Sequence, residues 1–324
     1  MKNIFITGQA GYIATCLAES LLDHTEVEKI VGIDIRPPDP ARLNLAHPKF
    51  HFIQRDVRDN MEKIIVDHGI DTIVHTAWVL APDHDARQME DINVRGTHNI
   101  LEAAKRIKVD QILYTSSTKA YGFHPDNEIP LTEESPLRGN TDFTYAKNKK
   151  EMEQVFKDFS LAHPKTVTTI LRPCFVAGPG LDNPLSHHLQ KPFVPLIRQT
   201  APFQYVHEDD LVRIMVLSLE QRLPEVYNVA PEGTMEFNQM VRILGNRPIQ
   251  LPDIVVRIFN NIAWHLRLKQ LTQFPNPALN LMRHPWIASS KKLIQATGYQ
   301  FQYNTQEAFL DYARYIQTQG KYSK

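Results

Sequence analysis

Cysteine is scarce in this chain, which has only Cys16 and Cys174 among its 324 residues. Two cysteines so far apart in sequence do not make a disulfide framework, so a reducing cytoplasm is the expected compartment. The first predicted strand begins by residue 3, which leaves no room for a signal peptide. No uncharged apolar run reaches the roughly 18 residues that a membrane-spanning helix needs.

Net charge is also lacking, because 36 Lys and Arg balance 36 Asp and Glu. A chain without an excess of either sign has no long-range field to attract nucleic acid or an anionic membrane. Its 14 histidines show no metal-ligand spacing, so no metal site is predicted. The composition, 42% apolar and 22% charged, is that of a soluble globular protein. A small molecule is the expected partner.

One amphipathic segment stands out in the C-terminal part of the chain. Residues 254–268 are apolar at positions 254, 255, 258, 259, 262 and 266, with polar or basic residues between them. This spacing predicts a helix with one apolar face. Packing of that face on a C-terminal lobe is the favoured interpretation, and contact with a membrane surface is the alternative.

Short apolar runs alternate with helical patterns along the chain. Strands are expected at 2–7, 29–34, 50–53, 71–77, 111–116, 166–172 and 225–229, and helices at 12–23, 58–68, 85–107, 142–160 and 209–221. Such alternation is typical of an α/β fold, with a doubly wound parallel sheet between two layers of helices. Six prolines within 173–202 interrupt the pattern. We therefore expect a sheet domain over 1–172 and about 206–230, and a substrate lobe over 173–205 and 231–324.

A glycine-containing turn follows the first predicted strand, in the sequence Thr7-Gly8-Gln9-Ala10-Gly11-Tyr12-Ile13-Ala14. Glycines let the backbone turn tightly and approach a pyrophosphate, and the helix that follows offers free N–H groups at its N-terminus. Asp34 ends the second strand, 23 residues after Gly11. A carboxylate at about this sequence spacing suits the ribose hydroxyls of an adenine dinucleotide. Together these features predict a dinucleotide site.

The choice between NAD and NADP depends on Asp34 and Arg36. The carboxylate of Asp34 repels a 2′-phosphate, whereas an arginine at position 36 is able to pair with one. NAD is therefore favoured over NADP. Asp56-Val57 follows the third strand, and two roles stay open for Asp56: a hydrogen bond to the adenine amino group, or a cap for the helix at 58–68.

Tyr145 and Lys149 carry the strongest chemical signal, together with the cluster Ser116-Ser117-Thr118. A free tyrosine has a pKa of about 10 and is a poor base. A lysine four residues later lies on the same helix face, and its positive charge favours the phenolate. The hydroxyl of Ser117 would hold a substrate oxygen. These are the parts needed to move a proton on or off an alcohol.

Taken in order, these elements resemble the extended short-chain dehydrogenase/reductase family, also called the NAD-dependent epimerase/dehydratase family. The resemblance covers nearly the whole chain. The matching elements are Thr7-Gly8-x-x-Gly11, Asp34, Asp56-Val57, His75-Thr76-Ala77, Asn93-Val-Arg-Gly-Thr97, Tyr114-Thr-Ser-Ser117, Tyr121-Gly122, Tyr145-x-x-x-Lys149, Leu171-Arg-Pro173, Gly178-Pro-Gly180, Val206-His-Glu-Asp-Asp210 and Tyr227-Asn-Val-Ala230.

The resemblance implies a Rossmann fold and a role for each matching residue. Tyr145 would be the acid/base, Lys149 would tune it and bind the nicotinamide ribose, and Ser117 would orient the reacting oxygen. The simpler alternatives are that Ser117 only ends a strand and that Lys149 is a solvated helix lysine. The implied cofactor contacts are Gly8, Ala10, Gly11, Tyr12, Ile13, Asp34, Arg36, Asp56, Val57, Thr76, Ala77, Trp78, Asn93, Thr115, Tyr145, Lys149 and Pro173. Asn93 is expected to tie the cofactor loops together.

Departures from the family pattern narrow the chemistry. Dehydratases place an Asp-Glu pair where this chain has Thr118 and Lys119, so it lacks the acid that eliminates water. Nucleotide-sugar epimerases usually carry an asparagine at the position of Phe175, where it meets the diphosphate. Trp78, Phe175 and Phe203, with Thr118 and Lys119 beside them, would line a pocket for an apolar or aromatic substrate. Core packing is the alternative for Phe175 and Phe203, and Arg198 is either an anion contact or a surface residue.

Three functions follow from this resemblance. The first is an NAD-dependent oxidoreductase acting on a secondary alcohol or ketone. The second is a nucleotide-sugar 4-epimerase that retains its NAD, and the third is a catalytically silent protein that senses the dinucleotide. The intact Ser117, Tyr145 and Lys149 favour the first two over the third. The resemblance also implies a homodimer formed through the helices at about 85–107 and 142–160.

Overall fold

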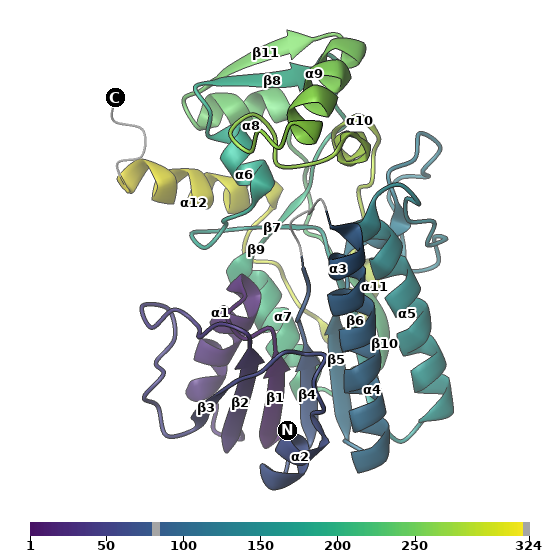
Figure 1. Cartoon of the computed structure of the whole chain (residues 1–324). Coiled ribbons are helices and arrows are strands. Elements are labelled where there is room, and N and C mark those ends of the chain that lie inside the picture. Colours follow the sequence, from purple (N-terminus) through teal and green to yellow (C-terminus); the bar gives the residue numbers. More distant parts are fainter. Residues whose placement is uncertain (80–84, 320–324) are drawn as a thin grey trace.

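Seven parallel strands form the central sheet of the computed structural model, which describes residues 1–79 and 85–319. The strands are β1 (Asn3–Thr7), β2 (Lys29–Asp34), β3 (Phe50–Gln54), β4 (Thr72–His75), β5 (Gln111–Thr115), β6 (Val167–Pro173) and β10 (Glu225–Val229). Their order across the sheet is β10-β6-β5-β4-β1-β2-β3, so the chain winds outward in both directions from the middle (Figure 1). The predicted doubly wound α/β fold is confirmed.

Alternating side chains give the sheet two buried faces. On β1, Ile4 and Ile6 belong to one apolar core and Phe5 to the other, because successive strand residues point to opposite sides. Helices α1 (Tyr12–Leu22) and α7 (Glu208–Glu220) contribute to the first core. Helices α2 (Glu62–Asp67), α4 (Gly96–Ile107) and α5 (Thr144–Ala162) contribute to the second. The sheet is therefore covered on both sides.

Two of the predicted helices differ in detail from the structure. The run expected at 85–107 consists of α3 (Ala86–Glu90), the π-helical turn η1 (Asp91–Arg95) and α4 in direct succession. Such π turns are rare and concentrate at functional sites. The helix expected at 58–68 begins only at Glu62, with Met61 as its N-cap. Asp56 therefore does not cap it, and that alternative is wrong.

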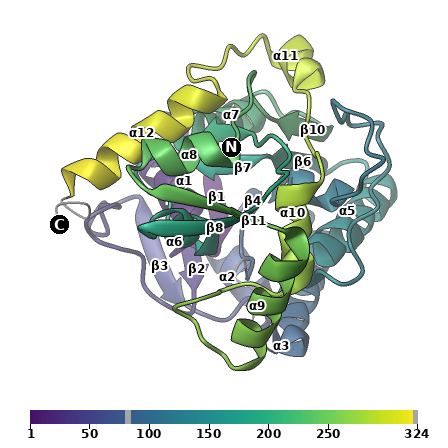
Figure 2. The ribbon, with the colours of Figure 1, turned by 90° about the horizontal axis from the view of Figure 1, so that it is seen from above.

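The lobe lies beyond the carboxyl ends of the sheet strands (Figures 1 and 2). It contains two small parallel sheets, β7 (Phe175–Ala177) with β9 (Tyr205–His207) and β8 (Phe193–Ile197) with β11 (Arg247–Leu251). The remaining helices are α6 (Pro184–Leu189), α8 (Phe237–Ile243), α9 (Asp253–His265), η3 (Asn276–Leu279), α10 (Asn280–Arg283), α11 (Lys291–Thr297) and α12 (Thr305–Thr318), and the short η2 (Thr118–Tyr121) follows β5. Helix α11 contacts β10 at the sheet edge. The predicted domain division stays a prediction.

Helix α9 is the amphipathic segment, but it does not pack as expected. Val256 and Ala263 are its buried residues, and Asn260 donates to the carbonyl of Phe274 at 3.1 Å. The predicted apolar stripe is 52–68% exposed at Ile254, Ile258, Phe259, Ile262 and Leu266. The expectation that this stripe packs on the lobe is wrong, because the helix is anchored through its opposite side.

A buried ion pair joins α5 to the sheet. The side chains of Arg172 on β6 and Glu153 on α5 are at most 1% exposed, and their charged atoms lie 2.6 Å apart. Arg172 also donates to the hydroxyl of Tyr121 at 2.6 Å, which in turn donates to Asn228 on β10 at 2.8 Å. Ser116 donates to the Glu153 carboxylate. Because every partner belongs to a different element, the network sets the position of α5 against β5, β6 and β10.

Breaking this pair from one side should destabilise the protein strongly. Arg172→Met leaves the Glu153 carboxylate buried and unpaired, and we expect a loss of about 3–5 kcal/mol in the free energy of unfolding. Adding Glu153→Leu should recover part of that loss, because both charges are then gone. Urea unfolding followed by circular dichroism measures both variants. Lys2→Met, which breaks the exposed pair with Glu28, is the control and should change nothing measurable. A double variant as unstable as the sum of its singles would contradict the coupling.

Candidate active site

Most of the predicted site residues gather in one cleft at the carboxyl ends of β1, β4, β5 and β6. The cleft encloses about 270 Å³, and the predicted residues that line it are Gly8, Gly11, Tyr12, Ile13, Thr76, Trp78, Thr115, Ser117, Lys119, Tyr145, Lys149, Pro173 and Phe175. This edge of a parallel sheet is where α/β proteins bind ligands. The remaining predicted residues do not line the cleft: Ala10, Asp34, Arg36, Asp56, Val57, Ala77, Asn93, Thr118 and Phe203.

The glycine turn brings bare backbone to the cleft. Gly8 has a φ of +73°, and a Cβ atom there would lie 2.7 Å from the Cα atom of Ala77. Gly11 is the N-cap of α1 and provides no side-chain cap. The first N–H groups of a helix have no partner within the helix, and their partial positive charge favours an anion. The turn is therefore shaped to hold a phosphate group against backbone.

Asp34 is fixed to the glycine turn by its carboxylate. One oxygen accepts a hydrogen bond from the backbone N–H of Ala10 at 3.1 Å, and the other accepts from the backbone N–H of Arg36 at 3.1 Å. The side chain of Arg36 is exposed. Asp34, the residue predicted to bind the ribose hydroxyls, thus lies at the end of β2, directly beside the glycine turn.

Asp56 is engaged in an ion pair. Its carboxylate lies 2.6 Å from Arg58, which also pairs with Asp91 at 2.7 Å. The hydrogen bond from Arg58 lowers the pKa of Asp56. Val57 is buried against α4, where a methyl group on Gly96 would lie 2.6 Å from it. The adenine contact of Asp56 stays a prediction.

Asn93 ties the loop after β4 to the π-helical turn, as expected. Its side-chain oxygen accepts from the backbone N–H of Val79 at 2.8 Å, and the residue is fully buried. Thr76 donates to the carbonyl of Thr7, and Ala77 donates its N–H to the Thr7 hydroxyl at 3.2 Å. These bonds hold the loop after β4 beside the glycine turn, so both edges of the cleft are positioned together.

Ser117 and Tyr145 form the polar floor of the cleft. Both are buried and line the cleft. Burial raises the pKa of Tyr145 above its ordinary value, and the nearby Ser117 hydroxyl opposes the rise only in part. Tyr145 is therefore protonated at neutral pH. Because Ser117 faces the cleft beside Tyr145, it does more than end a strand.

Lys149 is buried, so the alternative of a solvated helix lysine is wrong. It is 2% exposed, donates to the carbonyl of Thr115 at 2.7 Å and lies 3.6 Å from the ring centre of Trp78. Burial holds its pKa well below the usual range. Its ammonium is 5.9 Å from the ring centre of Tyr145. The expected lowering of the Tyr145 pKa does not occur in this arrangement, because burial of the phenol raises it.

Thr118 and Lys119 follow Ser117 in η2 and differ in what they face. Thr118 is fully buried and donates to the carbonyl of Pro173 at 3.4 Å, so it belongs to the wall rather than the cavity. Lys119 lines the cleft, with its ammonium 4.0 Å from the ring centre of Phe175 and 4.8 Å from that of Tyr145. Burial lowers the pKa of Lys119 to about 8. Within the described residues, the Lys119 ammonium has no hydrogen-bond or ion-pair partner.

Of the two phenylalanines predicted to line the pocket, only Phe175 does so. Phe175 lines the cleft, but Phe203 is fully buried and packs against Phe175 in a tilted arrangement, with 4.6 Å between ring centres. Phe203 is therefore core, and its expected place in the pocket wall is wrong because Trp286 and Phe237 also pack against it. A smaller cavity of about 60 Å³ adjoins the cleft through Lys119 and Phe175, and its other walls are Phe143, Asn183, Pro184, Leu185, Phe274, Ala278, Leu279, Leu281 and Met282.

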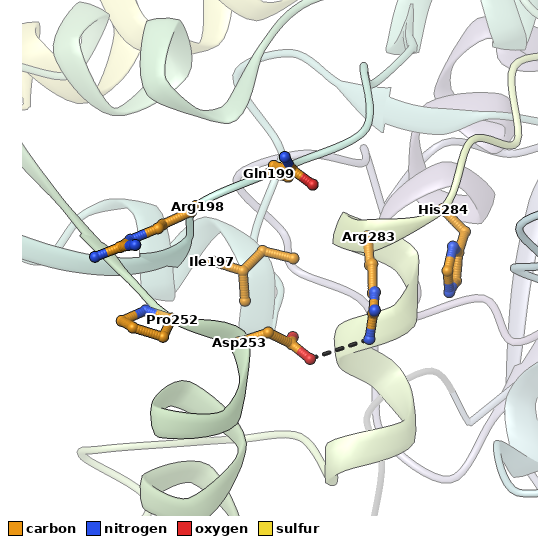
Figure 3. A pocket seen from close by; sticks show the side chains of 7 residues that line it. All are labelled: Ile197, Arg198, Gln199, Pro252, Asp253, Arg283 and His284. Carbon is orange, nitrogen blue, oxygen red and sulfur yellow. Dashed lines mark hydrogen bonds and ion pairs between the residues drawn. The ribbon is translucent and has the colours of Figure 1, made fainter.

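A third cavity, of polar character, shares no lining residue with the cleft. It encloses about 360 Å³ between the end of β8, the start of α9 and the end of α10 (Figure 3). Arg198 and Arg283 contribute guanidinium groups to its lining, and Asp253 pairs with Arg283 at 3.0 Å. Arg198 is thus a cavity residue.

Within residues 1–79 and 85–319, no group of three or more His, Cys, Asp or Glu side chains is placed to hold a metal.

A family comparison agrees with this geometry. Residues 4–230 match the model of the NAD dependent epimerase/dehydratase family. The chain belongs to this family. The matched residues include all seven strands of the central sheet and the group formed by Ser117, Tyr145 and Lys149.

Relatives of this family member act on different molecules. The chain is 31% identical over 178 residues to a UDP-glucose 4-epimerase of Yersinia enterocolitica, covering 52% of each. It is 28% identical over 231 residues to sterol demethylase protein B of Methylococcus capsulatus, covering 67% of this chain and 65% of the relative. UDP-glucose 4-epimerase from Bifidobacterium longum, crystallised with NAD+ and UDP, shares the fold with a TM-score of 0.76 and 20% identity over 99% of each chain.

Sequence reasoning missed Glu153 and the walls of the smaller cavity. Glu153 lies four residues after Lys149, so the helix spacing placed it on the same buried face as the reactive pair, and an acid there signals a buried cation. The cavity walls at 274–282 carry no comparable signal. They come from short helical turns that reach the cleft only through the folding of the lobe.

Any side chain at position 8 should clash with the backbone of Ala77, and glycine avoids this clash. In Gly8→Ala the methyl group would meet the backbone of Ala77, and we expect a loss of about 1–3 kcal/mol beyond the strain of the positive φ. Gly245→Ala is the matched control, because Gly245 has a φ of +77° with no atom within 4 Å of the new methyl group. Thermal unfolding compares the two variants. Equal losses in both would show that the close approach to Ala77 does not matter.

Proposed function

We propose that this protein is an NAD-dependent oxidoreductase that transfers hydride between a secondary alcohol or ketone and NAD. The observation that carries the proposal is that Ser117, Tyr145 and Lys149 line one cleft together with the glycines of the turn after β1. These are the groups needed to hold a substrate oxygen and to exchange its proton.

The residues around the cleft fit NAD. Gly8 and Gly11 leave room for a pyrophosphate at the N-terminus of α1, and Asp34 suits ribose hydroxyls while repelling a 2′-phosphate. The indole N–H of Trp78 is a buried donor with no hydrogen-bond partner in the described part of the chain, and Trp78 lines the cleft. Bound NAD supplies the hydride acceptor or donor, and the chain supplies the proton and the positioning.

The protonation state of Tyr145 favours its use as an acid. Because burial raises its pKa, the phenol is intact at neutral pH and is able to donate its proton to a ketone oxygen as the carbon gains hydride. Ser117 would hold that oxygen. In the reverse direction the alcohol proton passes to Tyr145, which must first be deprotonated. We propose that Lys149, which is anchored to Thr115, holds the nicotinamide ribose.

The walls beside Tyr145 support an apolar substrate. Phe175 stands where the family's sugar epimerases usually carry a diphosphate-binding asparagine, and behind it the smaller cavity is lined mainly by Phe, Leu, Met, Ala and Pro. A pocket of this composition stabilises apolar groups by removing them from water. The relative named sterol demethylase protein B is consistent with such a substrate.

Lys119 supports one charged or hydrogen-bonding group on that substrate. Its ammonium lies between the aromatic rings of Tyr145 and Phe175, at the junction of the cleft and the smaller cavity. An ammonium without a hydrogen-bonding partner in a partly desolvated site is stabilised by an acceptor, most strongly by an anion. We therefore propose an apolar alcohol or ketone that carries a carboxylate or another acceptor near the reacting carbon.

Nucleotide-sugar epimerisation is the second candidate. It is favoured by the relative and the solved structure that are named UDP-glucose 4-epimerases, and by Arg198 and Arg283 in the polar cavity, which suit a diphosphate. An epimerase would retain its NAD and show no net reduction. An oxidoreductase forms NADH when it is given a panel of apolar hydroxy acids. The absorbance of the reduced nicotinamide reports this reaction. Turnover of UDP-glucose without NADH release, and no response to that panel, would overturn the first proposal in favour of the second.

Tyr145→Phe should abolish turnover while leaving NAD binding intact, because only the phenolic oxygen is removed. We expect the rate to fall by about 100-fold or more. In the wild type, oxidation should speed up as the pH rises towards the raised pKa of Tyr145, whereas ketone reduction should not. Steady-state rates in both directions and calorimetric titration with NAD provide the readouts. Phe143→Leu, a change in the apolar wall, is a control that should move KM more than the pH dependence. Full activity in Tyr145→Phe would contradict the role of the phenol, whereas no turnover in the wild type with any substrate would favour the silent sensor.

Lys119 should give substrate binding its own pH dependence. With a pKa of about 8, it is charged below pH 8 and neutral above, so KM for an anionic substrate should rise as the pH passes 8. Lys119→Met should raise KM about tenfold or more at pH 7 and remove that rise. Lys119→Arg should keep the low KM and shift its rise beyond the measured range. An uncharged ester of the same substrate should respond to none of these changes, and an equal response would contradict the proposed role.

A further inference from the structure

The exposed face of α9 is a continuous apolar surface. On a helical projection Ile254, Ile258, Phe259, Ile262 and Leu266 fall on one side, because their spacing follows the helical repeat. Two further exposed apolar residues, Leu268 and Leu271, follow the end of the helix in the sequence. All seven side chains are 42–68% exposed, and together they form what we call the α9 patch. Soluble proteins seldom leave so many large apolar side chains together in water, so the α9 patch marks a contact surface.

The sequence around the α9 patch has an unusual charge. No Asp or Glu occurs between Asp253 and Glu307, whereas the whole chain has equal numbers of acidic and basic residues. Asp253, the first residue of α9, pairs with Arg257 and Arg283. Arg267 and Lys269 are exposed at the end of α9, beside Leu266 and Leu268, and neither has an ion-pair partner among the described residues. An apolar face with unpaired basic residues at one end is complementary to an anionic lipid surface.

We propose that the α9 patch docks this protein onto the surface of a bilayer containing anionic lipid. Helix α9 has 13 residues, too few to span the hydrocarbon core, so it would lie in the interface with its apolar side towards the acyl chains. The opposite side is held to the protein by Val256, Ala263 and the hydrogen bonds of Asn260. Figures 1 and 2 both place α9 at the outer edge of the lobe.

The position of the α9 patch also relates to the apolar cavity. Phe274, Ala278, Leu279, Leu281 and Met282, which wall that cavity, belong to the segment that follows the patch. This segment is tied back to α9, since Arg257 donates to Asn280 at 2.9 Å and Asn276 donates to the carbonyl of Arg257 at 3.0 Å. A docked α9 therefore brings the wall of the apolar cavity close to the lipid phase. The docking itself does not rest on the proposed reaction.

Vesicle flotation of the full chain tests the proposal. The probes are vesicles of phosphatidylcholine alone and vesicles in which about a third is phosphatidylglycerol. Wild-type protein should float with the anionic vesicles and be released by high salt. Phe259→Glu with Ile262→Glu should lower the vesicle-bound fraction at least tenfold. Arg267→Ala and Lys269→Ala should each weaken binding to anionic vesicles about fivefold, the effect of one interfacial cation.

Controls separate docking from misfolding and from self-association. Leu161→Glu changes a side chain that is 83% exposed at the end of α5, and it should float like the wild type. Thermal unfolding should match for all variants, because the altered side chains are exposed. The proposal is overturned if wild-type protein ignores anionic vesicles at low salt. It is equally overturned if light scattering shows an oligomer that Phe259→Glu dissociates, because a second copy would then cover the α9 patch.

Discussion

The buried pair of Arg172 and Glu153 is the interaction on which the site depends. It links β6 to α5, and through Tyr121 and Asn228 it reaches η2 and β10. Tyr145 and Lys149 lie two turns and one turn before Glu153 on the same helix, so the pair also fixes their height over the sheet. An isolated buried charge is very unfavourable, whereas a fully hydrogen-bonded pair tolerates burial. The network therefore permits few alternative positions for α5.

Burial sets the pKa values of the ionisable side chains in the cleft. Burial raises the pKa of Tyr145 and lowers those of Lys149 and Lys119, because each charged form loses hydration. The result is a phenol that keeps its proton beside amines that release theirs readily. Such a site suits proton donation to a carbonyl in the reductive direction. Burial therefore sets the direction of the Tyr145 pKa shift.

Two surfaces of the lobe support the proposed class of substrate. The cavity behind Phe175 is apolar inside, and the α9 patch is apolar outside, with the segment 274–282 contributing to the first and hydrogen-bonded to the helix that bears the second. A sparingly soluble alcohol or ketone partitions into a bilayer, so an enzyme that acts on it gains from residence there. The polar cavity with Arg198 and Arg283 is the feature that best fits the alternative of a nucleotide sugar.

Strand and helix periodicity, together with short local spacings, were enough to predict the sheet, the glycine turn, Asp34 and the group of Ser117, Tyr145 and Lys149. The folded chain was needed to show that Phe203 is core, that Asp56 pairs with Arg58, that the α9 stripe faces outward and that Glu153 anchors α5. Each of these depends on which distant segment occupies the neighbouring space. Periodicity shows that a helix has an apolar face, but the packing of the remaining chain decides whether that face is covered.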